Sequence, residues 1–475
     1  MPSAMKGALS KRHAVSRTYA PSGRPPSRKT IGPGTLTLLT LGGVMGSGLF
    51  LASAQAIHLA GPGVVVAYAI GAGVMALEVM ALAEMSAADP AQGSFLTYAR
   101  RSIGTAPAFI GGWIFWASSI LNLAAEATAA GTFARLWFPS APLYVFSMGF
   151  AAAITALNFL PLKNFDRVES SMSILKTAAI ALFIVVGGLA LAGLVRHGPA
   201  PGLAQAGGFF PKGVAGIGAA MTVVMFSMAG TGVLGLAAAS VRRPGHAIPQ
   251  AIGPSVIAVA AFYVLSALVI AGLTPWRSLS TAVESPFVKS LSVLPWAWAP
   301  SVLNAVLIVA VLSAMNAGLF ATDRVLASLA RMGDAPKALA PSQDHGAPTI
   351  ANAVTGVGLV VVAGLSYLLP KTAFLMLVTA TSYQALFIWI LIVVTQIFYR
   401  RWLERHEPER LHYRVPLYPY LSWFEIVLIV AIIATAPLAP TQVTALGIAA
   451  GLTAVAALSY LPVRAARARR AARTA

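Results

Sequence analysis

The sequence predicts an all-α integral membrane protein with twelve membrane-spanning helices, two of which are broken at mid-membrane. The first observation is composition, because the 475 residues are 57% hydrophobic and 10% charged, whereas soluble domains are about 25% charged. The second is a succession of apolar segments of about 20 residues, the length that crosses a bilayer. The third is a Gly-rich interruption in the middle of two of these segments.

Pro and Gly residues, which end helices, separate most of the apolar segments. The predicted spans are roughly 34–57, 62–87, 107–134, 142–161, 168–195, 214–240, 248–273, 300–328, 349–369, 372–399, 417–437 and 441–463. They form one membrane domain over 31–465, because no hydrophilic segment between them is long enough for a soluble domain. A short surface helix is predicted near 95–101.

Basic residues lie mainly on one side of the predicted membrane domain. With the N-terminus inside, the outer segments hold only Arg135, Arg196, Lys212, Arg277, Lys289 and Lys371. Every other Lys and Arg except Lys176 lies in an inner segment or in the tails at 1–30 and 466–475, as the positive-inside rule requires. Both termini are therefore predicted to be cytoplasmic, with the protein in the plasma (inner) membrane, and the formal charge of +19 implies no nucleic-acid partner.

The tail at 1–30 combines Lys and Arg with Pro and Ser, which is typical of a disordered segment. No apolar stretch of a signal peptide precedes the first span. The chain has no cysteine, which excludes disulfides and a Cys-based metal site. The isolated histidines have no ligand spacing, and no nucleophile–base set or phosphate loop is seen. We therefore expect no metal, no cofactor, no enzymatic activity and no obligate protein partner.

Gly46-Ser47-Gly48 interrupts the middle of the first span, together with Gly42 and Gly43. Each glycine costs about 1 kcal/mol relative to alanine inside a helix. Backbone N–H and C=O groups that are freed at this depth need partners, so a broken helix is tolerated only inside protein or beside a watery cavity. The freed groups are then available to bind a ligand.

Gly230-Thr231-Gly232 repeats this pattern in the middle of the sixth span. The copies are five spans apart, so they enter the membrane from opposite sides and define inverted repeats at 34–195 and 214–399, with extra spans over 417–463. Paired interruptions at matching positions of inverted halves are typical of the midplane site of a secondary transporter. Close helix packing through small residues is the alternative, and it is favoured for a single motif but not for two that match.

Two antiparallel broken helices present complementary ends to a ligand. A half-helix N-terminus offers unpaired N–H groups and about half a positive charge, which suits a carboxylate. A half-helix C-terminus offers unpaired carbonyl groups, which suit an ammonium. Side by side, these ends predict a site for the zwitterion of an α-amino acid.

Further motifs extend the pattern along the chain. They are Gly46-Ser47-Gly48-Leu49-Phe50, Ala56 to Pro62, Leu82-Ala83-Glu84-Met85, Gly93-Ser94-Phe95, Ala125 to Ala129, Phe226-Ser227, Ile248 to Ile252, Asn316 to Arg324, Ala330 to Pro336 and Arg414 to Pro419. On these motifs, residues 30–465 resemble bacterial amino acid permeases of the amino acid–polyamine–organocation superfamily, in the branch of proline, aromatic, lysine and γ-aminobutyrate permeases. The resemblance implies a LeuT-like fold of five plus five inverted spans, followed by two more.

The resemblance also implies which residues bind the substrate. They are Val44, Met45, Gly46, Ser47 and Gly48 at the first break, Phe226, Ala229, Gly230 and Thr231 at the second, and Ser118, Ser119 and Asn122 in the third span. The N–H groups of Ser47 and Gly48 are expected to bind the carboxylate, and carbonyl groups of both breaks the ammonium. Phe226 is expected to cover the pocket. Asn122 suits either the pocket or a helix–helix hydrogen bond.

Lys176 lies within the fifth span, about 12 Å along the helix from its start. An ionisable group at this depth indicates function, whereas snorkelling toward the inner end is the structural alternative. The resemblance implies that a lysine here replaces the Na⁺ of sodium-coupled relatives. Its ammonium is then expected to bridge carbonyl groups near Gly42 and Gly43 to Ser313 of the eighth span, and to take part in proton coupling.

Carboxylates also lie within the predicted spans. Glu126 matches a family position and is a second candidate for proton coupling, with a neutral, hydrogen-bonded structural role as the equal alternative. Glu84 is near an inner end, where loop arginines are expected to pair with it. The role of Glu78 stays open.

Two departures from the family pattern bear on the substrate. Gly232 stands where many relatives carry a Glu, and the loop after the sixth span reads Ser240-Val241-Arg242-Arg243-Pro244 where relatives are acidic. A carboxylate for a basic substrate is therefore missing at that place. We predict H⁺-coupled uptake of a neutral amino acid by a secondary active transporter. An amino acid/product exchanger and a non-transporting amino acid sensor are the alternatives.

Overall fold

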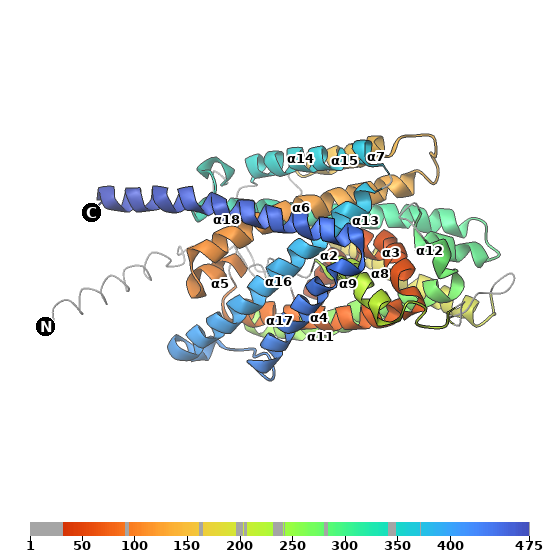
Figure 1. The fold of residues 1–475 in the computed structure, drawn as a ribbon, viewed down its shortest axis with the longest axis horizontal. Coiled ribbons are helices and arrows are strands. Elements are labelled where there is room, and N and C mark those ends of the chain that lie inside the picture. The colour runs from red at the N-terminus through yellow and green to blue at the C-terminus, as the bar shows by residue number, and fades with distance from the viewer. Residues whose placement is uncertain are drawn as a thin grey trace.

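The structure is a bundle of helices, most of which run side by side along its long axis (Figure 1). This computed structural model describes residues 32–90, 95–160, 165–195, 203, 207–230, 241, 243–279, 284–340, 348–370 and 372–474. Helix α5 (Phe95–Ser102) lies at one end of the bundle with the C-terminal part of α18 (Pro440–Thr474), and α12 (Pro286–Ser290) lies at the other. We call these ends the α5 end and the α12 end.

The helices follow one another through short loops. In chain order they are α2 (Pro33–Val44), η1 (Gly48–Ala52), α3 (Ser53–Ala60), η2 (Gly61–Gly63), α4 (Val64–Ala88), α5, α6 (Thr105–Ala134), α7 (Leu143–Leu157), α8 (Phe165–Leu191), α9 (Gly213–Met228), α11 (Pro244–Leu273), η4 (Trp276–Ser278), α12, η5 (Leu291–Val293), α13 (Ala299–Arg331), η6 (Lys337–Leu339), α14 (Thr349–Ala363), α15 (Leu365–Leu368), α16 (Ala373–His406), η7 (Pro408–Arg410), α17 (Tyr420–Ala434), η8 (Ala436–Leu438) and α18.

A helix lies in every predicted span, so the prediction of an all-helical, multi-span protein is confirmed. In the described part of the chain, 9 helices are long and apolar enough to cross a membrane, and α2, α7 and α9 are shorter apolar helices. The predicted surface helix is α5, and α18 continues through the basic segment at 466–474. The predicted tail at 1–30 and Thr231 lie outside the described residues.

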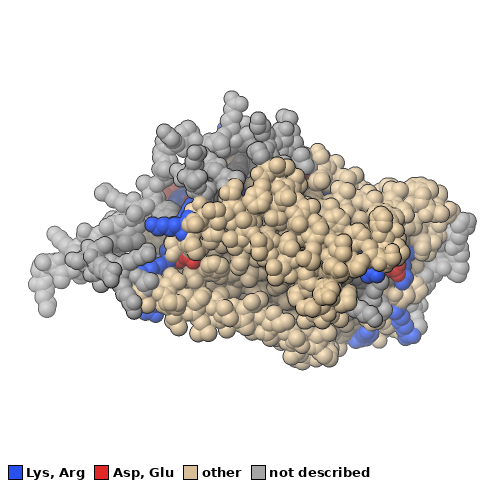
Figure 2. All heavy atoms as spheres, turned by 90° about the horizontal axis from the view of Figure 1, so that it is seen from above, with Lys and Arg blue, Asp and Glu red and all other residues tan. Residues whose placement is uncertain are grey.

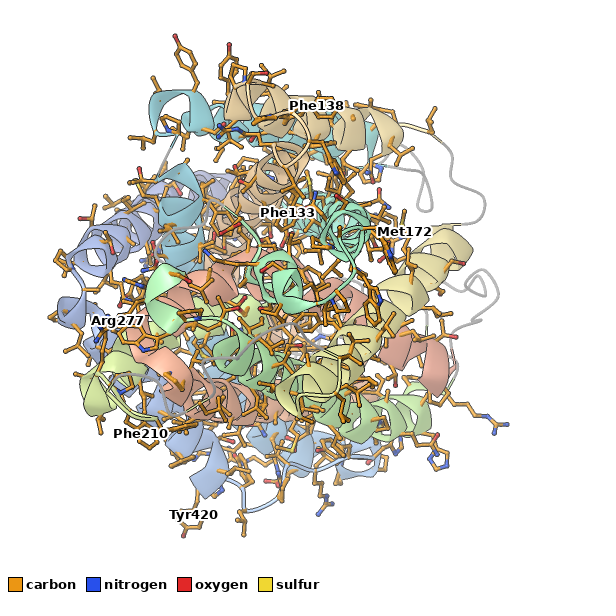
Figure 3. The ribbon with its side chains drawn as sticks, turned by 90° about the vertical axis from the view of Figure 1, so that its right-hand side faces the viewer. Phe133, Phe138, Met172, Phe210, Arg277 and Tyr420 are labelled. Carbon is orange, nitrogen blue, oxygen red and sulfur yellow. The ribbon has the colours of Figure 1, made fainter. Side chains whose placement is uncertain are left out.

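The sides of the bundle are apolar. On the face drawn in Figure 2, the charged side chains lie toward the two ends and leave a wide uncharged zone between them. Large apolar side chains such as Leu182 and Val427 are exposed on the helices. Seen from the α12 end (Figure 3), Phe133 lies among the helices, whereas Phe138 and Tyr420 lie at opposite edges. This surface suits the hydrocarbon of a bilayer rather than water.

The helices that carry the two predicted breaks lie inside the bundle. Helix α2 packs against α8 and α11, and α9 packs against α3, α4 and α16. Small residues allow this close approach, as is usual between membrane helices. A Cβ at Gly71 of α4, for example, would lie 2.5 Å from Val224 Cγ1 of α9. The first break is therefore shielded from lipid, as freed backbone groups require.

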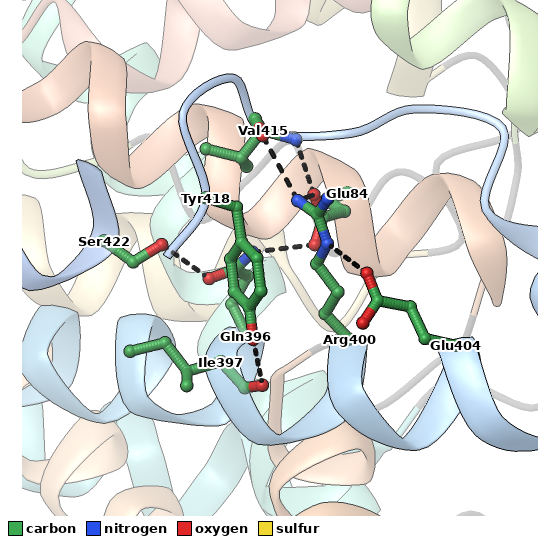
Figure 4. A network of polar contacts seen from close by, with 8 residues as sticks. All are labelled: Glu84, Gln396, Ile397, Arg400, Glu404, Val415, Tyr418 and Ser422. Carbon is green, nitrogen blue, oxygen red and sulfur yellow. Dashed lines mark hydrogen bonds and ion pairs between the residues drawn. The ribbon is translucent and has the colours of Figure 1, made fainter. Parts of the chain in front are cut away.

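A buried ion pair ties α4 to α16 and to the loop before α17 (Figure 4). Arg400 Nη1 lies 3.1 Å from Glu84 Oε2, which confirms the expected pairing of Glu84 with an arginine. Gln396 Nε2 donates to Glu84 Oε1 at 2.7 Å, and the Val415 N–H donates to Glu84 Oε2 at 2.5 Å. The carboxylate is thus fully supplied with donors, and the network fixes three segments of chain to one another.

The variant Arg400→Met is expected to lower the free energy of unfolding by about 3–5 kcal/mol, because it leaves the Glu84 charge buried without its partner. The double variant Glu84→Gln/Arg400→Met is expected to recover most of this loss. Intrinsic-fluorescence thermal unfolding in detergent measures both effects. Arg405→Met, on an exposed position of the same helix, is the control. Equal melting of Arg400→Met and Arg405→Met would show that the network adds no stability.

Candidate functional site

The first break lies where the glycine cluster predicts it. Helix α2 ends at Val44, Met45 is extended with ψ 91°, and a π-helical turn begins at Gly48. The Leu49 and Phe50 N–H groups both donate to Gly46 O, at 3.1 and 3.2 Å. Helical turns with irregular hydrogen bonding are frequent at functional sites.

The second break lies against the first. Helix α9 ends at Met228, Ala229 is extended, and Gly230 has a φ of +134°, which other residues rarely adopt. A Cβ at Gly230 would lie 2.5 Å from Gly43 O and 3.2 Å from Val44 Cα. The two interrupted segments therefore touch at Gly43 and Gly230. The continuation of this segment, with Thr231 and Gly232, is outside the described residues.

Hydrogen bonds hold the two breaks together. Ser227 Oγ donates to Gly48 O at 2.8 Å. The hydroxyl of Tyr263 on α11 lies 3.0 Å from Val44 O and 2.6 Å from Ser227 O. The Val44 carbonyl that was expected to bind the substrate's ammonium is thus next to a tyrosine hydroxyl. No sequence pattern distinguished Tyr263 from other buried aromatic residues.

The carboxylate of Glu126 on α6 occupies the start of the second half of span 1. The Ser47 N–H donates to it, with Ser47 N 3.1 Å from Oε1 and 2.9 Å from Oε2. Ser47 is completely buried, and Glu126 is 5% exposed. The resemblance gave the Ser47 N–H to the substrate, and Glu126 was expected either to couple protons or to be a neutral structural residue; the structure brings these two groups into direct contact.

A cavity of about 130 Å³ lies beside the two breaks. The sequence-predicted residues that line it are Val44, Gly48, Ser118, Ser119, Asn122, Glu126, Phe226, Ala229 and Gly230. Met45, Gly46 and Ser47 are buried next to it without reaching its surface. Asn122 therefore lines the cavity, which agrees with the pocket role, one of the two roles left open for it. Glu78 joins Glu126 in the wall, and no Lys, Arg or His is among the described lining residues.

The cavity extends toward the α5 end, and aromatic side chains pack together on its α12 side. Phe95, Val325 and Ile392 line it on the α5 side. On the α12 side, the rings of Phe50 and Phe287 meet edge to face with centroids 5.4 Å apart. Ser285 Oγ donates to Phe50 O at 2.8 Å, so the loop that carries α12 is fixed over the first break.

Lys176 contacts the end of α2. Its Nζ donates to Gly42 O at 2.7 Å, and the side chain is 1% exposed, so it does not snorkel. The expected bridge from Lys176 to Ser313 stays a prediction, and Ser313 Oγ donates to Glu169 Oε1 at 3.0 Å. Glu169 interacts electrostatically with Lys176 and is itself buried. Glu169 of α8 is thus a hydrogen-bond partner of Ser313 on α13.

Sequence reasoning missed Glu169, although one signal was available. Glu169 precedes Lys176 by seven residues, which is two helical turns, so both side chains lie on one face of α8. A Cβ at Gly42 would lie 3.3 Å from Glu169 Oε1, so both ionisable groups converge on the same glycine. Glu169 thus interacts electrostatically with the buried ammonium of Lys176, which needs compensating negative charge inside the protein.

A family model of amino acid permeases matches residues 35–474. The chain belongs to the amino acid permease family. The permease is 34% identical over 398 residues to the uncharacterized amino acid permease YtnA of Bacillus subtilis (strain 168), covering 83% of this chain and 86% of the relative. It is also 34% identical over 398 residues to the gamma-aminobutyric acid permease of the same organism, covering 83% and 84%. The resemblance inferred from the sequence motifs is confirmed, and the family is one of transporters rather than enzymes.

The fold of the permease is shared with a solved transporter. The crystal structure of an Eremococcus coleocola manganese transporter aligns with a TM-score of 0.55 at 12% identity, over 90% of this chain and 94% of that chain. At this identity the likeness shows the fold alone. The permease is thus an all-helical, multi-pass membrane protein of known architecture.

Proposed function

We propose that this permease is a secondary active transporter that takes up an amino acid by alternating access, coupled to H⁺. The proposed architecture is LeuT-like, with five plus five inverted spans and two more, in the plasma membrane with both termini in the cytoplasm. Support comes from the paired breaks at Gly46-Ser47-Gly48 and Gly230, which meet inside the bundle beside a cavity. Paired breaks of this kind mark the midplane site of secondary transporters.

The contact of these breaks at the cavity is the observation that carries the proposal. It brings an N–H-bearing helix start at Ser47 and Gly48 close to the carbonyl-bearing helix ends at Val44 and Ser227. A zwitterion needs both kinds of group within a few ångströms of each other. We therefore propose the cavity as the substrate site, with the carboxylate at the helix start, Phe226 as cover, and Ser118, Ser119 and Asn122 around the side chain.

A neutral amino acid is the proposed substrate class. Gly232 and the basic loop at Arg242 and Arg243 leave that region without the carboxylate that a basic substrate needs. The relative named gamma-aminobutyric acid permease handles a zwitterion without net charge, which agrees with this class. Lys176 at Gly42 and Glu126 at Ser47 are the proposed coupling residues, because each joins an ionisable group to one side of the first break.

Proteoliposome uptake with labelled L-alanine, L-proline, L-phenylalanine, γ-aminobutyrate and L-lysine tests the proposal. A pH gradient, acidic outside, is expected to drive accumulation of at least one neutral substrate into empty vesicles without Na⁺. Uptake that requires internal amino acid would establish an exchanger instead. Specific binding without flux would establish a sensor, and preferential uptake of L-lysine would refute the neutral class.

A further inference from the structure

The protein itself supplies a carboxylate to the backbone group that a substrate carboxylate is proposed to use. Both oxygens of Glu126 lie within 3.1 Å of Ser47 N. A Cβ at Gly46 would lie 2.5 Å from Glu126 Oε1, so this glycine makes room for the carboxylate. The start of the half-helix is therefore occupied by an internal ligand.

Two carboxylates cannot share this position. Both Glu126 oxygens already accept from the Ser47 N–H, and two negative charges in a buried site repel each other strongly. A substrate carboxylate therefore reaches Ser47 only after Glu126 has left. Once displaced, a charged Glu126 would lose the hydrogen bond that stabilises its charged form.

We propose that Glu126 is an internal competitor of the substrate's carboxylate, and that its displacement takes up the coupled proton. The inference rests on the proposed transport function. In this step the Ser47 N–H exchanges Glu126 for the substrate carboxylate, and one Glu126 oxygen binds a proton from the solvent. The zwitterion adds no net charge, so the site gains one positive charge, that of the proton.

Charged and titratable groups surround Glu126, and the Lys176 ammonium stabilises its charged form at Ser47. Lys176 on α8 and Tyr263 on α11 interact electrostatically with Glu126, and Glu78 on α4 lines the same cavity. The described residues of α13 and α16 that line the cavity are uncharged, and the lining residue from α5 is Phe95. No described residue of α7, α14 or α18 lines the cavity. A displaced Glu126 thus meets a second carboxyl group in the cavity wall, which disfavours two charges and favours protonation.

The carbonyl side of the site has a matching arrangement. One hydroxyl proton of Tyr263 serves both Val44 O and Ser227 O, which lie 3.0 and 2.6 Å away. These carbonyl groups belong to the two helix ends proposed for the ammonium. Side chains of the protein therefore bind the backbone groups on both sides of the site, Glu126 the N–H group and Tyr263 the carbonyl groups. A zwitterion must compete with both side chains.

Proton uptake on ligand binding tests the inference directly. Purified protein in weakly buffered detergent is mixed with L-alanine, L-proline, L-phenylalanine or γ-aminobutyrate, while a pH indicator and calorimetry record protons and binding. For a ligand that binds, wild type is expected to take up about one proton per ligand. Glu126→Gln is expected to take up none, and its affinity for the ligand is expected not to vary with pH.

Amines that lack the carboxylate provide a test on the wild-type protein alone. The four amino acids without their carboxylates are ethylamine, pyrrolidine, 2-phenylethylamine and propylamine. These amines are expected to cause no proton uptake. Glu425→Gln removes another buried carboxyl group, outside the cavity wall, and is expected to leave proton uptake unchanged.

The inference would be overturned if Glu126→Gln took up as many protons on ligand binding as wild type does. It would also be overturned if the amines caused the same proton uptake by wild type as the amino acids do. The proposed transport function fails separately, if wild type neither binds nor transports any amino acid of the panel.

Discussion

Replacement of Gly48 by alanine is expected to reduce amino acid uptake by roughly 5- to 150-fold. The added Cβ would lie 2.6 Å from Ser227 Cα, a backbone atom that cannot turn aside as a flexible side chain can. Overpacking of this kind costs about 1–3 kcal/mol, and every 1.4 kcal/mol is a factor of about ten. The cost falls on the contact between the two breaks, so it affects the substrate site first. Initial uptake rates in proteoliposomes measure it.

Gly73→Ala is the matched control for Gly48→Ala. Gly73 lies on the neighbouring helix α4, is exposed, and has nothing within 4 Å of an added Cβ. This variant is expected to transport like wild type, with a slightly more stable helix. Wild-type uptake by Gly48→Ala at normal expression would show that the close contact of the breaks is not required for transport.

The helices were predictable because hydrocarbon leaves a spanning backbone few alternatives. Apolar length therefore located a helix in each predicted span, and the differences are at the ends. Helix α16 runs to His406, seven residues beyond its predicted span, and α18 runs to Thr474. Both extensions are rich in arginine, and hydropathy does not mark the end of a helix that continues into water.

The backbone part of the candidate site was also predictable, since glycine clusters weaken a helix wherever they occur. Its side-chain partners were harder to find. Tyr263 and Glu169 reach the first break from α11 and α8, and their contacts depend on how those helices are rotated against α2. Glu126 was a candidate, but its contact with Ser47 depends on a tertiary approach that no local pattern shows. Helices buried on most sides have little polar periodicity that could indicate such a rotation.

The variant Lys176→Met is expected to reduce ΔpH-driven uptake at least about tenfold. It removes the donor to Gly42 O and leaves Glu169 buried beside α2 without its neighbouring cation. Uncompensated buried charges cost about 3–5 kcal/mol, so a loss of stability is also expected. Thermal unfolding in detergent and proteoliposome uptake measure the two effects separately.

The double variant Lys176→Met/Glu169→Gln distinguishes a coupling role from simple charge balance. Removing both charges is expected to restore most of the stability, because Glu169 is then neutral and Ser313 can still donate to the amide oxygen. Uptake is expected to stay low, since the link between α8 and Gly42 is still missing. Full recovery of uptake would show that Lys176 serves only as a counter-ion. A strict Na⁺ requirement in wild type would contradict the proposal that Lys176 replaces that ion.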